Sequence, residues 1–184
     1  MPADSPKARD LELLDAVDAL PRESFRGTAW RVVREGRDPL IGSPSLSRWC
    51  NGAFDVFYTS LELDGALAEI FSLLSSQPVF PSRPIWAAYE LDVATTRSLR
   101  LANVAALGKF GVETSTYRER RYEQTQALAD AAYFLDFDGL IVPSARWDCL
   151  NLVLFTSRLA PEDLALAKPE GEPIDWQGWR KRAR

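Results

Sequence analysis

The sequence predicts a single α+β domain built around a mixed, curved sheet. Its 184 residues fit one domain and can bury a sizeable core. Runs rich in β-branched and aromatic residues alternate along the chain with helical patterns of apolar residues, so strands and helices interleave. The run Leu150–Phe155 is apolar on both faces of a strand. That pattern is typical of a central strand in a sheet.

The first expected elements are a helix and a core strand. The segment Asp10–Leu20 places its apolar residues at helical spacing, and Pro21 ends the pattern. The segment Gly27–Val33 reads as a strand that is apolar apart from Arg31. An unpaired buried charge is costly, so Arg31 is expected to pair with a carboxylate of the protein or to bind an anionic ligand. The sequence leaves both alternatives open.

A long loop, rich in Gly, Pro, Ser and Asp, is predicted over Arg34–Asn51. Long loops inside compact domains are often functional. Arg48 lies near the end of this loop, where it is either a surface charge or a binding residue. The aromatic and β-branched run Phe54–Tyr58 then predicts a strand that is at least partly buried.

A helix is predicted to follow this strand and to reach Leu74. Thr59 and Glu62 have the spacing of a capping box, which predicts reciprocal hydrogen bonds at the start of the helix. Glu69 lies beside the apolar stripe of the helix rather than opposite it. With Tyr58 at the end of the preceding strand, this arrangement indicates either the wall of a cleft or ordinary packing and solvation.

The second half of the chain continues the alternation. The expected elements are strands at Ile85–Leu91, Leu99–Leu101, Leu140–Val142 and Leu150–Phe155, a helical turn at Val104–Leu107, and a helix over Tyr117–Leu135. Ser144 follows one of these strands and Asn151 lies at the mouth of the next. The two residues are therefore expected to lie close together, although either could be a turn residue. The tail has no clean pattern, and its basic end over 179–184 is typical of a solvated terminus.

Composition excludes several classes of protein. Hydrophobic content is 46% and charged content 26%, an ordinary balance for a globular protein. The net charge of −4 does not suggest a nucleic-acid-binding surface. No apolar run reaches membrane-spanning length, and the N-terminus lacks the apolar core of a signal peptide. The sequence therefore predicts a cytoplasmic protein with no membrane or nucleic-acid partner.

The chain contains no histidine. This absence excludes Ser-His-Asp and Cys-His nucleophile chemistry and histidine-based metal sites. Cys50 and Cys149 are too few for a zinc site and are expected to be buried small hydrophobes rather than a disulfide. The remaining chemistry rests on Glu/Asp, Arg/Lys, Tyr and Ser/Thr. These side chains suit the binding of an anionic substrate and the stabilisation of a positive charge that develops during a reaction, with no metal.

Several segments, in this order, resemble the RES domain, the toxin half of RES–Xre toxin–antitoxin pairs. The likeness is carried by Ala29–Val32, Ser47–Asn51, Phe57–Ser60, Ala66–Glu69, Phe137–Arg146 and Asn151–Phe155. Together they span residues 27–157, which are expected to form the catalytic domain. Residues 1–26 would then be an N-terminal extension with a helix, and residues 158–184 a C-terminal extension with a basic tail.

The resemblance implies a fold like that of ADP-ribosyltransferase toxins. It also implies cleavage of the nicotinamide–ribose bond of NAD⁺, with NAD⁺ as substrate and no further cofactor. The ADP-ribose would pass to phosphate or water, which degrades NAD⁺, or alternatively to a cellular protein. A non-catalytic binding module of the same fold is a further alternative. The implied protein partner is an Xre-like antitoxin.

The resemblance also implies roles for individual residues. Arg31 and Arg48 match the family's arginines near the dinucleotide, and Tyr58 matches a tyrosine against the nicotinamide or its ribose. Glu69 and Ser144 match the glutamate and serine of the family's name. The predicted catalytic residues are Glu69, Arg31 and Ser144, and the predicted substrate-binding residues are Arg48, Tyr58 and Asn151.

Overall fold

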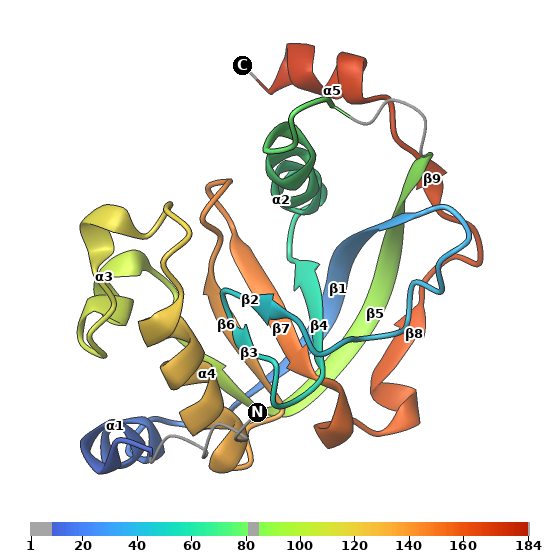
Figure 1. Cartoon of the computed structure of the whole chain (residues 1–184). Coiled ribbons are helices and arrows are strands. Elements are labelled where there is room, and N and C mark those ends of the chain that lie inside the picture. Colours follow the sequence, from blue (N-terminus) through green and yellow to red (C-terminus); the bar gives the residue numbers. More distant parts are fainter. Residues whose placement is uncertain (1–8, 81–84, 184) are drawn as a thin grey trace, which may run out of the picture.

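The computed structural model describes residues 9–80 and 85–183, which form one α+β domain, as predicted. Helices cover both sides of a strongly curved sheet (Figure 1). The strands are β1 (Glu23–Arg34), β2 (Leu46–Ser47), β3 (Cys50–Asn51), β4 (Val56–Ser60), β5 (Trp86–Arg100), β6 (Gly139–Pro143), β7 (Leu150–Phe155), β8 (Leu164–Leu166) and β9 (Glu172–Pro173). The α-helices are α1 (Leu11–Asp18), α2 (Leu63–Ser75), α3 (Val104–Gly108), α4 (Glu123–Phe134) and α5 (Trp176–Arg182).

The main sheet of the described residues is mixed and closed. Its strand order is β1-β4-β7-β6-β5-β8, and β1 also pairs with β5, which closes the ring. The pair β5–β6 is parallel, whereas β1–β5, β4–β7 and β6–β7 are antiparallel. The helices α2 and α5 lie together over one part of the sheet, while α1, α3 and α4 lie over another (Figure 1). The predicted mixed, curved sheet is confirmed.

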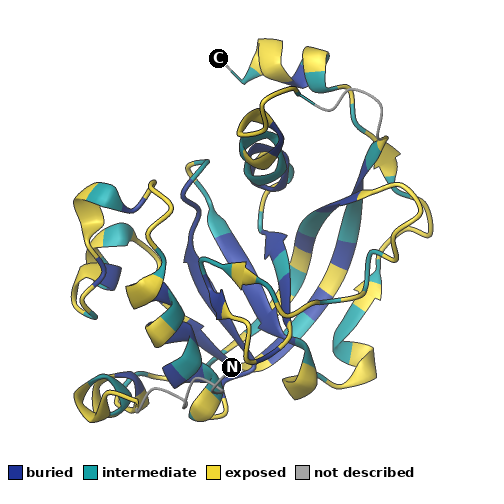
Figure 2. Cartoon of the chain, viewed as in Figure 1, coloured by how far each residue is buried: buried dark blue, intermediate teal, exposed yellow. Residues whose placement is uncertain are grey.

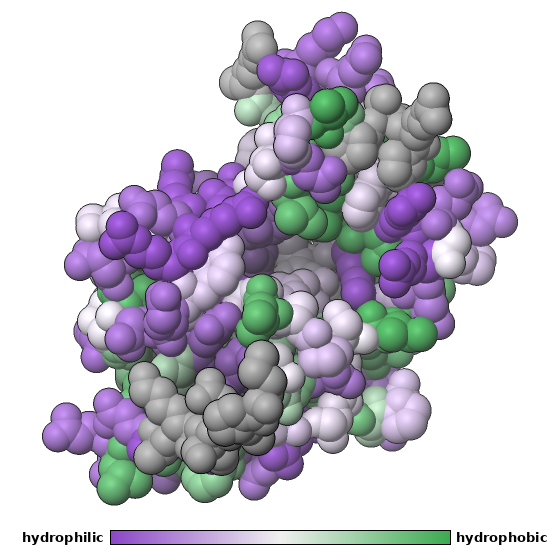
Figure 3. Space-filling model, in the orientation of Figure 1, coloured by the Kyte–Doolittle hydropathy of each residue, from purple (hydrophilic) through white to green (hydrophobic). Residues whose placement is uncertain are grey.

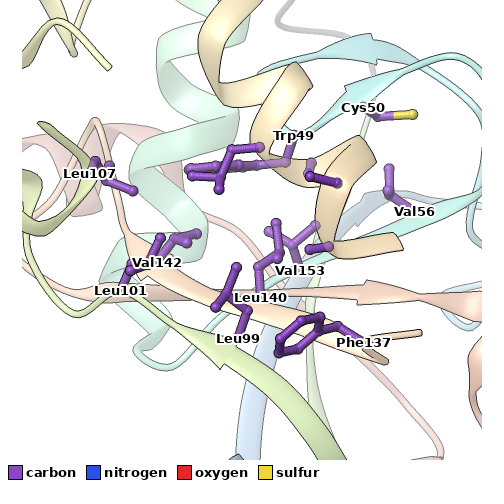
Figure 4. Close-up of a cluster of buried hydrophobic side chains, with 14 of the residues drawn as sticks. Trp49, Cys50, Val56, Leu99, Leu101, Leu107, Phe137, Leu140, Val142 and Val153 are labelled. Atoms are coloured by element: carbon purple, nitrogen blue, oxygen red, sulfur yellow. The ribbon is translucent and has the colours of Figure 1, made fainter. Parts of the chain in front are cut away.

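The buried apolar side chains form three clusters that pack against this sheet. Strands β6 and β7 are buried along almost their whole length, whereas the outer faces of the helices are exposed (Figure 2). Trp49 from the β2–β3 hairpin is 1% exposed and joins the cluster that α1, α3 and α4 form with the sheet. Figure 4 shows its ring over Leu140 and Val142 of β6. The hairpin is therefore anchored to the core by its own tryptophan.

The strands predicted at Ile85–Leu91 and Leu99–Leu101 are in fact parts of one strand, β5. Between them the sequence is polar, which hides the continuity. The carboxylate of Asp138 satisfies backbone groups in this polar stretch, because it accepts hydrogen bonds from the amides of Thr96 (2.6 Å) and Arg97 (2.8 Å). Asp138 is thus buried and braces the middle of β5.

The predicted capping box at Thr59 and Glu62 is wrong. Thr59 belongs to β4, and its hydroxyl donates to the carbonyl of Leu152 on β7 at 2.7 Å. Glu62 is the N-cap residue of α2 but makes no side-chain cap hydrogen bond. A buried hydroxyl is already satisfied by the neighbouring strand, so it cannot serve the helix end. The helix itself is confirmed.

Two other segments differ from prediction. The helix expected from Tyr117 begins at Glu123, because Tyr117 is buried and donates its hydroxyl to the Pro143 carbonyl at 2.6 Å. The C-terminal tail is structured: β8 and β9 pair with β5, and α5 follows. Trp179 of α5 is buried, and its Nε1 donates to Asp64 Oδ1 on α2 at 2.8 Å. The tail therefore packs on the domain, although Arg180, Lys181 and Arg182 are exposed.

Candidate active site

Glu69 of α2 lies where the helix meets the ends of β6 and β7. Its Oε1 accepts hydrogen bonds from Ser144 Oγ (2.7 Å) and Asn151 Nδ2 (3.0 Å). The β6–β7 register pairs Val142 with Asn151, which brings Asn151 beside Ser144, as predicted. Both bonds go to the same oxygen, so the carboxylate is held in one orientation with Oε2 unbonded by the described residues. A fixed carboxylate of this kind can stabilise a positive charge.

A glycine allows α2 to approach the sheet closely enough to place Glu69. A Cβ on Gly65 would overlap Ser60 Oγ of β4 and Cys149 Sγ beside β7. Gly65 is four residues before Glu69, so both lie on the same face of the helix. The tight contact at Gly65 therefore sets the position of the carboxylate.

Arg31 points from β1 into the same region. Its NH2 donates to the Ile41 carbonyl at 2.9 Å, and its guanidinium carbon lies 3.9 Å from the centre of the Phe57 ring. Burial lowers the pKa of Arg31 to about 10, opposed by the charge of Asp38. In the described part of the chain no carboxylate lies within 4.0 Å of it, and its buried NH1 has no hydrogen-bond partner. Of the two alternatives left open by the sequence, the geometry favours an anionic ligand.

Arg48, on the β2–β3 hairpin, has surroundings like those of Arg31. Its guanidinium carbon lies 4.6 Å from the ring centre of Tyr117 and 4.9 Å from that of Tyr122, and its NH2 donates to the Glu119 carbonyl at 3.1 Å. Its NH1 is also buried, again with no partner among residues 9–80 and 85–183. Two arginines thus each present an unsatisfied donor. Buried donors in this state are expected to meet a ligand, because leaving them unpaired costs free energy.

Tyr58 lines the cavity and also forms hydrogen bonds with the β2–β3 hairpin. Its hydroxyl accepts a hydrogen bond from the Trp49 amide at 2.8 Å and shares a second with Ser47 Oγ at 2.7 Å. Burial raises the pKa of Tyr58 above its ordinary value, so the hydroxyl stays protonated. Since the hydroxyl is engaged with the hairpin, the ring is the part of Tyr58 that a ligand would meet.

Gln126 was not predicted from the sequence. Its Nε2 donates to the carbonyls of Ser47 (2.8 Å) and Cys50 (3.0 Å), so α4 clamps both sides of the hairpin that carries Arg48. No sequence signal marks this residue, because its partners lie more than 70 positions away.

Most of these groups line one cavity of about 440 Å³, within the usual range for small-molecule sites. Five of the six predicted site residues are on its wall, and Ser144 lies behind Glu69 as a hydrogen-bond donor. Figure 3 shows the hollow in the middle of the face, below α2. Sequence reasoning assigned no site role to five further lining residues that carry charge or an aromatic ring: Trp30, Trp49, Arg120, Tyr122 and Arg146.

No grouping of three His, Cys, Asp or Glu side chains able to hold a metal ion occurs within residues 9–80 and 85–183. Over the same residues, no helix is long and apolar enough to cross a membrane.

The fold and the site together define a class of protein. The closed mixed sheet carries a cavity. This cavity is lined by guanidinium groups with unpaired donors and by one oriented carboxylate. Such a site is built to bind an anionic ligand and to stabilise positive charge next to Glu69.

Comparison with protein families matches residues 28–177 to the RES domain. The chain therefore belongs to the RES domain family, as its motifs indicated. Among curated proteins it is similar to the NAD(+) phosphorylase MbcT of Mycobacterium bovis and of Mycobacterium tuberculosis. Each is 25% identical over 166 residues, covering 86% of this chain and 89% of the relative.

Among solved structures, the fold matches a chain of the crystal structure of the M. tuberculosis MbcT–MbcA toxin–antitoxin complex. The TM-score is 0.81 at 21% identity, and the match covers 96% of this chain and 100% of the other. The comparison confirms the fold.

Proposed function

We propose that this protein is a toxin that degrades NAD⁺ by cleaving the bond between nicotinamide and ribose. The observation that carries the proposal is the placement of Glu69, fixed by Ser144 and Asn151, in one cavity with the unsatisfied NH1 atoms of Arg31 and Arg48. Membership of the RES domain family and similarity to proteins named NAD(+) phosphorylase support it.

The proposed mechanism uses Glu69 as the charge stabiliser. When the nicotinamide–ribose bond breaks, its electron pair stays on the nicotinamide nitrogen and neutralises the pyridinium ring. The ribose carbon is left as an oxocarbenium-like cation, which a nearby carboxylate stabilises. Nicotinamide leaves as a neutral molecule, so the step needs no general acid. Ser144 acts by orienting Glu69 through its 2.7 Å hydrogen bond.

The other residues would hold the substrate. Guanidinium groups bind phosphate oxygens with charge-assisted hydrogen bonds, so Arg31 and Arg48 are assigned to the pyrophosphate of NAD⁺. The Tyr58 ring offers a stacking face for nicotinamide. Asn151 donates to Glu69 and has a buried Oδ1 without a partner among the described residues, which can accept a hydrogen bond from a ribose hydroxyl or from the carboxamide.

Cellular context completes the proposal. NAD⁺ is the substrate and no further cofactor is required. Residues 27–157 carry all six assigned groups and are proposed as the catalytic part of the chain. We place the protein in the cytoplasm, where it meets the NAD⁺ pool, and assign it an Xre-like antitoxin as its partner. A protein of the same fold is found in a toxin–antitoxin complex, which supports this assignment.

Incubation of the purified protein with NAD⁺, followed by mass measurement of the products, tests the proposed function. We expect nicotinamide together with ADP-ribose or its phosphate adduct. Glu69→Gln should lower turnover by about 100-fold or more, the scale of losing one charge stabiliser. Its melting temperature should change little, because the amide oxygen still accepts from Ser144 and Asn151.

Glu62→Gln is the matched control, since Glu62 is an exposed glutamate at the start of the same helix. It should turn over NAD⁺ at the wild-type rate. Wild-type turnover by Glu69→Gln would remove Glu69 from the mechanism. A product in which ADP-ribose is attached to a protein would indicate the alternative function, ADP-ribosyl transfer to a protein.

A further inference from the structure

Tyr117 is a buried side chain that contacts both halves of the candidate active site without lining the cavity. It is 5% exposed and belongs to the same core cluster as Trp49. Its hydroxyl donates to the Pro143 carbonyl at 2.6 Å, and its ring centre lies 4.6 Å from the guanidinium carbon of Arg48. Tyr117 is not among the described residues that line the cavity. Any effect of Tyr117 on a ligand therefore passes through the residues that it holds.

The hydroxyl of Tyr117 fixes the end of β6, next to the serine that orients Glu69. Pro143 is the last residue of β6, and its carbonyl accepts the hydrogen bond from Tyr117. The next residue, Ser144, donates through Oγ to Glu69 at 2.7 Å. Burial raises the pKa of Tyr117 above its ordinary value, so the hydroxyl stays protonated and can donate. A shift of the Pro143 carbonyl would carry Ser144 with it, because the two residues share a planar peptide bond.

The ring of Tyr117 supports the other half of the site. It makes one of two aromatic contacts of Arg48, and Tyr122 makes the second at 4.9 Å. A cation over an aromatic ring is attracted by the negative face of the ring, more strongly where water is excluded. The two rings and the Glu119 carbonyl together hold the guanidinium, whose buried NH1 has no partner among the described residues. Loss of one ring would leave this donor less constrained.

Tyr117 is the one buried residue in an otherwise accessible segment, 113–121. A 3₁₀ turn over Thr114–Thr116 leads into it, and the Glu113 carboxylate stabilises that turn by accepting from the Ser115 amide at 3.2 Å. Phenylalanine would fill the same space but would deprive the buried Pro143 carbonyl of this donor. The ring and the hydroxyl of Tyr117 therefore each have a distinct partner, and both partners belong to the site.

We propose that Tyr117 is a positioning residue that couples the Arg48 end of the site to the Glu69–Ser144 pair. This role rests on the proposed function. Through its ring, Tyr117 holds the cation assigned to the pyrophosphate, and through its hydroxyl it holds the peptide unit that leads to Ser144. One rigid side chain thus sets the separation between the bound anion and the carboxylate. Catalysis depends steeply on such separations.

Steady-state kinetics of two variants distinguish the two contacts. Tyr117→Phe keeps the ring and removes the hydroxyl, so kcat should fall by about tenfold as Glu69 is misplaced. Its KM for NAD⁺ should change by less than about threefold, because binding through Arg48 is retained. Tyr117→Leu removes both contacts, so the KM should also rise by roughly tenfold, the scale of one lost cation–π contact. Phenylalanine should thus restore the KM that leucine impairs, but not kcat.

Tyr133→Phe is the matched control. Tyr133 also has an arginine over its ring, Arg158 at 4.8 Å, and its hydroxyl shares a hydrogen bond with Ser157 at 3.0 Å, but it lies outside the cavity lining. This variant should keep both wild-type constants. A lower melting temperature in Tyr117→Phe, with kcat and KM unchanged, would overturn the proposal and leave Tyr117 as a core residue only. An equal loss of kcat in Tyr133→Phe would overturn it as well.

Two measurements that need no turnover separate this role from the proposed function. Inorganic pyrophosphate should raise the melting temperature of the wild type, Tyr117→Phe and Tyr133→Phe, and much less that of Tyr117→Leu. In a crystal structure of Tyr117→Phe, the distance from Ser144 Oγ to Glu69 Oε1 should exceed about 3.0 Å, the usual upper limit for such a bond.

Both results, in a protein that never consumes NAD⁺, would support the positioning role while rejecting NAD⁺ cleavage. Equal protection of all four proteins by pyrophosphate, or protection of none, would overturn the role of the ring. An unchanged distance between Ser144 and Glu69 would overturn the role of the hydroxyl. Either result rejects the proposed coupling.

Discussion

Arg31 is a cation in a setting that disfavours cations. Burial lowers its pKa to about 10, which still leaves the guanidinium charged at neutral pH. The Phe57 ring and the Ile41 carbonyl compensate part of the cost of burial, but NH1 finds no partner among the described residues. An anionic ligand would accept a hydrogen bond from NH1 and offset the rest of the free-energy cost of burying the guanidinium. Retaining a cation here is therefore better explained by binding than by stability.

Arg31→Lys separates these explanations. Lysine keeps the charge but loses the planar fork, so NAD⁺ should bind about tenfold more weakly. Burial also lowers the pKa of an ammonium, from about 10.4 in water. Only the protonated group binds the pyrophosphate, so affinity is lost as pH rises through the pKa. The loss should therefore begin at lower pH in the variant than in the wild type, where it centres near 10.

Titrations of NAD⁺ between pH 7 and pH 10, in a Glu69→Gln background that slows turnover, measure this effect. Arg34→Lys is the matched control, because Arg34 is an exposed arginine of the same strand. It should leave both the affinity and its pH dependence unchanged. Unaltered binding by Arg31→Lys, with melting lowered by several degrees, would assign Arg31 to structure instead.

A site residue can be predicted from the sequence when its position is marked by the residues near it in the chain. Glu69 stands at the apolar border of a regular helix, and Ser144 and Asn151 flank neighbouring strands, so pattern and family motif indicate them. Arg120 and Arg146 carry no such mark. Their significance comes from meeting in one cavity with residues far away in the chain, and spacing along a sequence does not encode that proximity.

At the level of elements, the position of α2 controls the site. The helix carries Glu69 on one face, and its close approach to β4 and β7 depends on the missing side chain at Gly65. The helix also packs against β1 and β5, and Asp64 accepts a hydrogen bond from Trp179 of α5. A small displacement of α2 would move the carboxylate relative to the arginines, which lie on β1 and the β2–β3 hairpin. Misplacement of this kind lowers catalysis strongly.

Gly65→Ala tests this dependence. Alanine favours a helix over glycine by about 1 kcal/mol, yet its Cβ would overlap Ser60 Oγ and Cys149 Sγ. We expect NAD⁺ turnover to fall by about tenfold or more and melting to fall by several degrees. The triple variant Gly65→Ala, Ser60→Ala, Cys149→Ala removes both overlapping atoms and should recover much of the turnover. Full activity of Gly65→Ala alone would show that the contact is not critical.

Elements could be predicted where their pattern is self-contained. The apolar stripe of α2 and the apolar run of β7 determine those elements locally, and both were predicted. The capping box failed because Thr59 serves a strand partner across the sheet. The continuity of β5 was missed because Asp138, about 40 residues away, satisfies its polar middle. In both cases a tertiary partner outweighs the local signal.

For the whole molecule, the interleaved pattern predicts the α+β class but not the closure of the sheet. Closure requires β1 to pair with β5 along almost its full length, and the two strands are separated by the hairpin, β4 and α2. Such a non-local pairing leaves no periodicity in the sequence. The closed sheet matters for function because it holds β1, β4 and β7 around one cavity, so that Arg31, Tyr58 and Asn151 line the same wall.

The proposed activity also requires a partner that inhibits the protein in the cell that makes it. An enzyme that consumes cellular NAD⁺ would poison the cell that makes it. The cavity is open to solvent, carries a formal charge of +3 from four lining arginines and one glutamate, and has exposed apolar side chains on its lining at Leu46 (81% exposed) and Leu73 (49%). An antitoxin that presents a carboxylate, from an acidic side chain or its C-terminus, would find bidentate partners in Arg31 and Arg48. Those apolar side chains would add contact area.

Co-expression with the Xre-like product of an adjacent gene should therefore abolish NAD⁺ loss and protect residues 35–51 from proteolysis, because this segment ends in the β2–β3 hairpin that carries Arg48 into the covered cavity. Expression of Glu69→Gln alone should be harmless, while this variant still binds the antitoxin, since the arginines are unchanged. Arg48→Lys should weaken antitoxin binding, because lysine lacks the planar fork. If the wild-type protein expressed alone leaves growth and cellular NAD⁺ untouched, the toxin assignment fails, because no partner is then needed to restrain it.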